Sequence, residues 1–135
     1  MFVVTTPSGR MDGDPATEEL REELVSAART TVGDELRSVA YFTSDAVDQL
    51  YLRDDLEEGA DLVGFAENER LGFRSQTTYK RTELGDYRFT IRVFEGGYVT
   101  RVIRGDHGVW VTTDEMSIQR FAELGSAIGE ILEAA

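Results

Sequence analysis

The chain has 135 residues, which is enough for one domain with a single buried core. It contains no cysteine, which excludes disulfide frameworks, thiolate metal sites and cysteine nucleophiles. Its 26 acidic and 14 basic residues give a formal net charge of −12, and no apolar run approaches the roughly 18 residues that a membrane span requires. Because its first residues also lack the charged start and long apolar centre of a signal peptide, we expect a cytoplasmic protein.

The basic residues are almost all arginine, since Lys80 is the single lysine among the 14. In nearly molar salt, charges are screened beyond roughly 3 Å, so a net charge of −12 costs little in self-repulsion and keeps the surface hydrated. Arginine pairs with carboxylates through a planar fork and holds that geometry better than lysine. The composition therefore predicts the cytoplasm of an extreme halophile, which concerns habitat and not activity.

The first predicted element with clear start and end signals is a helix that ends before Gly33. Asp14 is typical of a helix cap, Pro15 is typical of the first helical position, and acidic residues fill the first turn. Apolar residues at steps of three and four predict its buried stripe, which is Leu20, Leu24, Ala27, Ala28 and Val32. We expect residues 1–13 to be a tail that can be disordered, and residues 14–135 to form a single domain.

The next predicted elements are a strand and two helices. Residues 36–43 alternate between two sides, which predicts a strand. Ser44 can cap a second helix over residues 46–56, whose apolar residues fall at helical spacing: Val47, Leu50 and Tyr51. A third helix follows from about residue 60, and its predicted buried residues are Leu62, Phe65, Ala66 and Phe73. Residues 74–85 are ambiguous, and we expect a helix that fades into a loop.

A three-stranded antiparallel meander is predicted next. Residues 88–94 and 98–104 flank Gly96 and Gly97, which suit a tight hairpin turn because glycine readily adopts positive φ. A four-residue turn at 105–108 leads into a strand at 109–113. Thr112 and Glu115 have capping-box spacing for a terminal helix, whose predicted stripe is Ile118, Phe121, Ala122, Ile128 and Leu132.

The predicted order of elements is therefore α-β-α-α-β-β-β-α. This is an α+β single domain in which an antiparallel three-stranded meander and an additional strand carry helices packed mainly on one face.

The meander has two different faces. One is nearly all apolar and is expected to be core: Phe89, Ile91, Val93, Thr100, Val102, Val109 and Val111. The other holds the candidate functional residues: Arg92, Phe94, Arg101, Ile103 and Trp110. With the turn at Gly96 and Gly97, Arg92 lies directly opposite Arg101, a repulsive pair worth a few tenths to about 1 kcal/mol. We therefore expect an anion or an acidic group between the two arginines.

Three interpretations of this candidate face remain open. Acidic parts of the same chain can cover it, with the run Asp54, Asp55, Glu57 and Glu58 as the candidate cover. A second copy or another protein can bind it, since Trp, Phe and Arg are favoured interface residues. A small anion, a nucleotide or single-stranded RNA can bind where arginine and aromatic side chains alternate. A net charge of −12 disfavours a polyanion, so nucleic acid is not expected.

No catalytic constellation accompanies this face. His107 is the single histidine and falls in a predicted turn, without a Ser or Cys elbow or a second His for a metal. The acidic run at 53–58 has neither the spacing nor the glycine of a calcium loop. We expect no enzyme activity, no metal and no cofactor.

Short motifs over residues 18–133 resemble a family of small uncharacterised proteins from haloarchaea. They are a Y-x-R-D-D element (Tyr51, Arg53, Asp54 and Asp55), a T-x-R-V-F-E strand that begins at Thr90, and a G-V-x-V-x-x-D ending from Gly108 to Asp114. That family carries no assigned activity. The resemblance thus supports the halophilic habitat and implies no catalytic residues.

The order of elements is also similar to the profilin-like arrangement of roadblock domains, which are non-enzymatic, dimerising regulators. The predicted order has one strand before the central helix, where a roadblock domain has two. The resemblance implies a non-enzymatic interaction or regulatory domain, here of a halophilic archaeon and acting as a homodimer. The alternative is a sensor that binds a small ligand, a nucleotide or an anion on the Arg and aromatic face.

Overall fold

The computed structural model describes residues 16–62, 64–78 and 83–135. They form an α+β domain with one antiparallel sheet, which confirms the predicted fold class. The predicted tail, residues 1–13, lies outside the described residues. The elements are α1 (Glu18–Val32), a short 3-10 turn (Gly33–Glu35), β1 (Leu36–Thr43), β2 (Val47–Leu52), α2 (Phe65–Thr78), β3 (Thr90–Phe94), β4 (Gly97–Arg104), β5 (His107–Thr113) and α3 (Ile118–Ala134).

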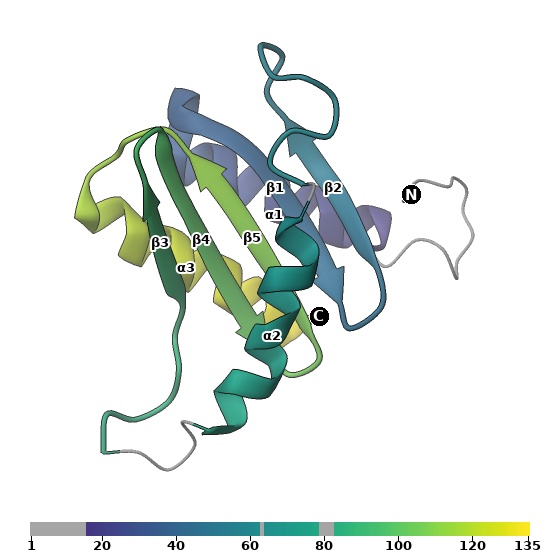
Figure 1. The fold of residues 1–135 in the computed structure, drawn as a ribbon, viewed down its shortest axis with the longest axis vertical. Helices are drawn as coiled ribbons and strands as arrows, with labels where there is room; N and C mark the ends of the chain where they lie inside the picture. The colour runs from purple at the N-terminus through teal and green to yellow at the C-terminus, as the bar shows by residue number, and fades with distance from the viewer. Residues whose placement is uncertain (1–15, 63, 79–82) are drawn as a thin grey trace.

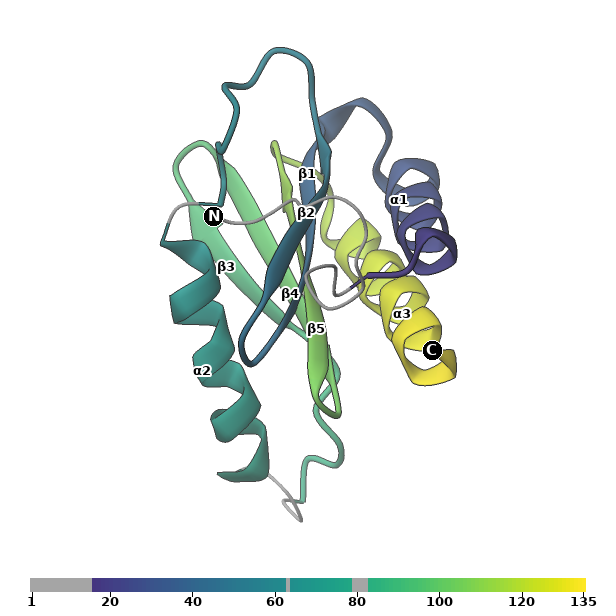
Figure 2. The same cartoon turned by 90° about the vertical axis from the view of Figure 1, so that its right-hand side faces the viewer.

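The sheet has the strand order β2-β1-β5-β4-β3, so β2 and β3 are its edges. Helices α1 and α3 lie side by side on one face, and α2 crosses the other face alone (Figures 1 and 2). The central strands therefore contribute side chains to two separate cores. One core joins the sheet to α1 and α3, and the other packs beneath α2. In the described part of the chain, no helix is long and apolar enough to cross a membrane.

Helix α1 begins later than the sequence predicts. Thr17 is its N-cap, and the Thr17 hydroxyl accepts a hydrogen bond from the Leu20 amide at 3.1 Å. Asp14 and Pro15, the predicted cap and first residue, lie outside the described residues. The helix ends as predicted at Gly33, whose φ of 79° suits glycine. Its predicted stripe is confirmed, with Ala27 only partly buried.

The predicted second helix is wrong, because residues 47–52 form strand β2. Thr43 and Ala46 close a tight turn, and β2 returns antiparallel to β1. A bulge opposite Val39 and Ala40 leaves Leu50 without a direct partner on β1, since Val39 faces Tyr51 and Ala40 faces Gln49. This extra residue breaks the alternation of two. The apolar residues of β2 consequently fall at a spacing that imitates a helix.

The remaining helices differ from prediction mainly at their ends. Helix α2 starts at Phe65 and continues to Thr78, and its predicted apolar residues pack in the core beneath it. Of the ambiguous stretch 74–85, residues 79–82 lie outside the described part and residues 83–85 are irregular. Helix α3 starts at Ile118 after Ser117, so the predicted capping box is wrong: Thr112 belongs to β5. Two members of its predicted stripe, Ile118 and Ala122, are exposed.

The first hairpin turn lies one residue earlier than predicted, and the second is two residues shorter than predicted. Phe94 faces Gly97 across a turn at residues 95–96, and Arg104 faces His107 across a turn at residues 105–106. Each predicted register is therefore wrong by two residues. A shift of two keeps every side chain on its predicted face, because the side-chain period of a strand is also two. The residues were therefore assigned to the correct face of each strand, but the prediction that Ile91 and Val93 belong to the core is wrong. On the edge strand β3 they are 37% and 73% exposed.

Candidate protein-interaction surface

The five candidate residues of the meander lie on the face that α2 covers. Trp110 and Ile103 are fully buried there and Arg101 is 7% exposed, whereas Phe94 is 54% exposed. Arg92 lies between these extremes, with 40% of its side chain exposed. The structure thus brings the five residues together but leaves only Phe94 and Arg92 accessible. An uncovered Arg and aromatic face, as the strands alone predict, is not present.

Trp110 is an anchor of the core beneath α2. Its ring packs against Phe42 at 5.2 Å and Phe65 at 6.1 Å between ring centroids. Its indole N–H donates to the backbone carbonyl of Asp61 at 3.1 Å, so the one polar atom of the ring is satisfied. Trp110 therefore fixes the loop before α2 as well as the helix itself.

The acidic group expected between the two arginines is Glu69 of α2. Its carboxylate accepts hydrogen bonds from Nε of Arg92 at 2.9 Å and from Nη1 of Arg101 at 3.2 Å. The Glu69 side chain is 2% exposed. Arg92 and Arg101 are not directly opposite, since Arg92 faces Val99 and Arg101 faces Thr90. A carboxylate from the same chain therefore occupies the position between the two arginines that an external anion would take.

Arg101 is also held from the other side. Its Nη2 donates to the Thr90 hydroxyl at 2.8 Å, and its guanidinium lies 5.9 Å from the centre of the Tyr87 ring. Helix α2 approaches this guanidinium at Gly72, where a Cβ would lie 2.4 Å from Nη1 of Arg101. The absence of a side chain at Gly72 is what lets the helix lie on the buried arginine.

The acidic run predicted to cover the arginines lies elsewhere. Asp55 pairs with Arg53 at 2.6 Å, at the end of β2, and Arg53 also pairs with Asp114 at 2.8 Å. The guanidinium of Arg53 lowers the pKa of Asp55, chiefly through their hydrogen bond. These residues bind β2 to the end of β5. An acidic part of the same chain does cover the arginines, as one interpretation predicted, but the covering residue is Glu69 and not the run at 54–58.

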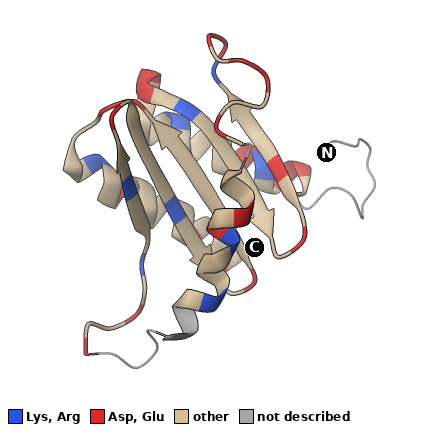
Figure 3. Ribbon diagram, in the orientation of Figure 1, with Lys and Arg blue, Asp and Glu red and all other residues tan. Residues whose placement is uncertain are grey.

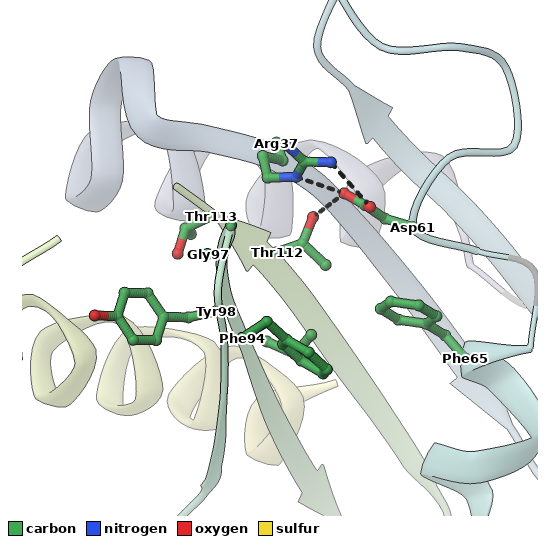
Figure 4. Close-up of a pocket in the computed structure, with 10 residues that line it drawn as sticks. Arg37, Asp61, Phe65, Phe94, Gly97, Tyr98, Thr112 and Thr113 are labelled. Atoms are coloured by element: carbon green, nitrogen blue, oxygen red, sulfur yellow. Dashed lines mark hydrogen bonds and ion pairs between the residues drawn. The ribbon is translucent and has the colours of Figure 1, made fainter. Parts of the chain in front are cut away.

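A second polar cluster, which sequence reasoning missed, is centred on Asp61. Its carboxylate accepts from Nε of Arg37 at 2.9 Å and from the Thr112 hydroxyl at 2.6 Å (Figure 4). The Thr112 oxygen also lies 2.6 Å from the Ser38 hydroxyl. Asp61 has a φ of 60°, in the left-handed region that Asp tolerates better than most residues. Burial raises the pKa of Asp61, but the hydrogen bonds from Arg37 and Thr112 and nearby positive charge outweigh it and lower the pKa.

The accessible part of the meander is its edge strand, β3. Val93 is 73% exposed and Phe94 54%, on opposite faces of the strand, and Ile91 is also exposed. In an antiparallel ladder only every second residue bonds to its neighbour, so alternate N–H and C=O groups of β3 point away from β4. The order of the meander alone did not identify this edge, because its last strand, β5, also has one sequential neighbour within the meander and lies in the middle of the sheet.

His107 does more than occupy a turn. It is the first residue of β5, its Nδ1 lies 2.9 Å from the Tyr41 hydroxyl, and its Nε2 lies 3.1 Å from the carbonyl of Leu132 in α3. These contacts join two strands to the last turn of a helix. Within the described ranges, no group of three or more His, Asp or Glu side chains is arranged to hold a metal ion.

Comparison with solved structures places the fold among roadblock-like domains. The gliding protein MglB from Thermus thermophilus matches with a TM-score of 0.58 at 13% identity, over 89% of this chain and 96% of that chain. An MglB structure described as having a tetrameric arrangement matches with a TM-score of 0.57 at 14% identity, over 88% and 94%. A Roadblock/LC7 domain from Streptomyces avermitilis matches with a TM-score of 0.51 at 13% identity, over 87% and 92%.

The resemblance to roadblock domains is thereby confirmed at the level of fold. The expected departure, a single strand before the central helix, disappears because β2 supplies the second strand. No curated protein matches the chain with significance. A family model described as "Domain of unknown function (DUF7522)" matches residues 22–133, which is most of the chain. The chain belongs to the DUF7522 family.

Proposed function

We propose that this domain is a non-enzymatic interaction domain that self-associates through the free edge of β3. The observation that carries the proposal is an edge strand with exposed apolar side chains on both faces, Val93 on one and Phe94 on the other. Edge strands of monomeric proteins are usually protected by charges, prolines or a covering segment. The one charged side chain of β3, Arg92, is already paired with Glu69.

Self-association through β3 would pair the free backbone N–H and C=O groups of that strand and bury its exposed apolar side chains. A second β3 can extend the sheet by main-chain hydrogen bonds, while its apolar residues meet those of the first copy. A twofold contact of this kind is self-complementary and closes at a dimer. One solved structure of the same fold is described as MglB with a tetrameric arrangement, which supports self-association as a property that this fold can have.

The alternative role, a sensor for an anion or nucleotide, has less support. Both arginines that would hold the anion already share Glu69, whose side chain is 2% exposed. A ligand would have to displace that carboxylate and separate α2 from the sheet. The Arg and aromatic face therefore serves better to stabilise the domain itself, and the free edge of β3 is the better candidate for binding a partner.

Sedimentation equilibrium in molar KCl tests the proposal. We expect the wild-type mass to rise with concentration toward a dimer, and Val93→Lys to weaken association by at least about tenfold, or roughly 1.4 kcal/mol, because a lysine would be desolvated at the contact. Leu84→Lys is the matched control, since Leu84 is 95% exposed and lies outside the sheet. A wild-type mass that stays monomeric at all concentrations would contradict the proposal.

We also propose that the domain works in concentrated salt. The net charge of −12 supports this habitat, since screening removes its self-repulsion. Urea unfolding at increasing KCl should show a rising midpoint. A midpoint that falls with salt would contradict the proposed habitat without affecting the proposed self-association.

A further inference from the structure

A hollow of about 200 Å³ lies on the α2 side of the sheet, beside the turn between β3 and β4. The residues that line it and carry the argument are Arg37, Asp61, Phe65, Phe94, Gly96 and Thr112. Figure 4 shows the Phe65 and Phe94 side chains reaching toward the hollow from α2 and from the end of β3, with Arg37 and Asp61 above them. The walls thus include two aromatic rings and one ion pair.

The size and chemistry of the hollow limit what can enter it. Sites for small molecules usually measure about 300–1,000 Å³, so this hollow suits a single side chain better than a whole ligand. Its charged atoms are already engaged, because the Asp61 carboxylate accepts from both Arg37 and Thr112. An entering group gains most by burying apolar surface between Phe65 and Phe94. The expected occupant is an aromatic or large aliphatic side chain.

The surroundings of the hollow are acidic. Strand pairing brings the start of β1, the ends of β2, β3 and β5 and the start of β4 to one end of the sheet. The segments that follow or precede those ends carry Asp34, Glu35, Asp54, Asp55, Glu57, Glu58, Glu95, Asp114 and Glu115. Asp55 and Asp114 pair with Arg53, and Glu35 pairs with Arg120, so the acidic excess comes from the other six. Figure 3 shows these acidic segments gathered at that end, around the turn after β3 and the loop after β2. A basic partner is favoured there and an anionic one is repelled.

From this combination we infer that the hollow is a docking site for a basic segment of another protein. An aromatic or aliphatic anchor of the segment enters between Phe65 and Phe94, and flanking Lys or Arg residues face the acidic end of the sheet. A symmetric contact with a second copy would place carboxylates against carboxylates with no cation between them, so a basic segment of a different protein complements this end of the sheet better. This site adjoins the proposed pairing of β3 edges and shares Phe94 with it, but its other lining residues lie outside β3.

Synthetic peptides provide the direct probe. One peptide carries a phenylalanine flanked on each side by Lys and Arg, and its counterpart has serine in place of the phenylalanine. Fluorescence anisotropy in molar KCl, the medium in which the domain is proposed to work, should show the phenylalanine peptide binding at least about tenfold more tightly, because only that peptide buries an aromatic side chain. Equal binding of the two peptides, or no binding of either, would overturn the inference.

Two pairs of variants locate the binding. Gly96→Phe should reduce binding of the phenylalanine peptide to that of the serine peptide, because Gly96 lines the hollow and a Cβ there meets no atom within 4 Å. Ser44→Phe, at the opposite end of the sheet, should leave binding unchanged. Glu95→Lys should weaken binding more than Glu22→Lys, since both side chains are exposed but Glu22 lies on α1. Equal effects within either pair would overturn the inference.

Amide chemical shifts of the wild-type protein give a readout that needs no variant to fold. The phenylalanine peptide should perturb the signals of Gly96, Val99 and Thr112 more than that of Ser44. Perturbations concentrated away from the hollow would overturn the inference. Sedimentation of Gly96→Phe distinguishes this site from the proposed self-association, because loss of peptide binding with an unchanged oligomeric state separates the two.

Discussion

The carboxylate of Glu69 lies 3.2 Å from Nη1 of Arg101, and both side chains are almost fully buried between α2 and β4. The same carboxylate accepts from Nε of Arg92 at 2.9 Å. A buried acid shared by two arginines is costly to form but much more costly to break, because removing one partner leaves an uncompensated charge. This relationship ties α2 to the sheet and accounts for the covered face of the meander.

Glu69→Leu should therefore destabilise the domain by about 3–5 kcal/mol, and Arg101→Met by a similar amount. The double variant should cost clearly less than the sum, because neither charge is then left alone. Urea unfolding of the four proteins in molar KCl measures the coupling. Arg92→Gln is the control, since its side chain is 40% exposed and should cost about 1 kcal/mol or less. Additive single effects would contradict a buried ion pair.

Gly72→Ala should destabilise the domain although alanine is the better helix former. A Cβ at Gly72 would lie 2.4 Å from Nη1 of Arg101 and 2.6 Å from Cδ1 of Ile103. Arg101 cannot easily move away, because Glu69 and Thr90 hold its guanidinium. We expect a net loss of stability of about 1–3 kcal/mol, because overpacking outweighs the gain of about 1 kcal/mol in helix propensity that alanine brings.

Thermal unfolding of Gly72→Ala, compared with Ser75→Ala on the exposed side of α2, measures this cost. Ser75→Ala should change stability by less than about 0.5 kcal/mol, as is usual for a surface position. In the Arg101→Met background the cost of Gly72→Ala should shrink, because the obstructing guanidinium is gone. An equal cost in both backgrounds would show that Arg101 is not the obstacle.

Local sequence patterns were sufficient for most elements but not for β2. Periods of two and of three to four located β1, the meander and the helices, since each of these has an unbroken alternation or stripe. In β2 the extra residue, Leu50, destroys the alternation, so the bulge lies within β2 itself, opposite the step from Val39 to Ala40 on β1. A strand whose own period is broken has no local pattern that separates it from a helix, and only its pairing with β1 defines it. The strand conformation of β2 is therefore set by its tertiary pairing and not by its local sequence.

The prediction placed the candidate residues on the correct face of the sheet, but it did not identify the helix residue that covers them. An error of two residues in each hairpin left Arg92, Arg101 and Trp110 on the same face. The covering residue, Glu69, precedes the meander by more than twenty positions and is one of many acidic residues, so nothing local distinguished it. Gly72 was the available signal, because a glycine within an apolar helical stripe indicates close approach to another element.

Asp61→Asn should destabilise the domain by about 1–3 kcal/mol at neutral pH, since the partly buried guanidinium of Arg37 and the buried hydroxyl of Thr112 lose their charged acceptor. Asn tolerates the left-handed backbone at φ 60° as Asp does, so the loss reports on the charge and not on backbone strain. Because the folded state lowers the pKa of Asp61, its contribution is fully present above the ordinary aspartate pKa of about 3.9. It is lost as the pH falls through the lower pKa of the folded state.

Urea unfolding of wild type and Asp61→Asn across this acidic range measures the difference. The two stability curves should lie apart at neutral pH and converge as Asp61 becomes protonated. Arg37→Gln should give a similar convergence, because Arg37 is the principal partner of the carboxylate. A constant separation down to strongly acidic pH would contradict a role for the charge of Asp61.

Tyr41 should titrate above the ordinary tyrosine pKa of about 10. Burial raises the pKa of Tyr41, and the negative charge of Asp106 raises it further. The fold therefore favours the protonated phenol, and this contribution to stability is present below about pH 10 and is lost as the pH rises through the folded pKa. Ultraviolet absorbance of tyrosinate should show a late component among the five tyrosines that Tyr41→Phe removes.

Tyr41→Phe also removes the hydrogen bond to Nδ1 of His107, which should cost about 1 kcal/mol at neutral pH. The stability difference from wild type should narrow at alkaline pH, because the wild-type contribution declines there and the variant has none to lose. Asp106→Asn should move the late titration to lower pH without abolishing it, since burial of the phenol is the larger cause and is unchanged. A late component that persists in Tyr41→Phe would assign the raised pKa to another tyrosine.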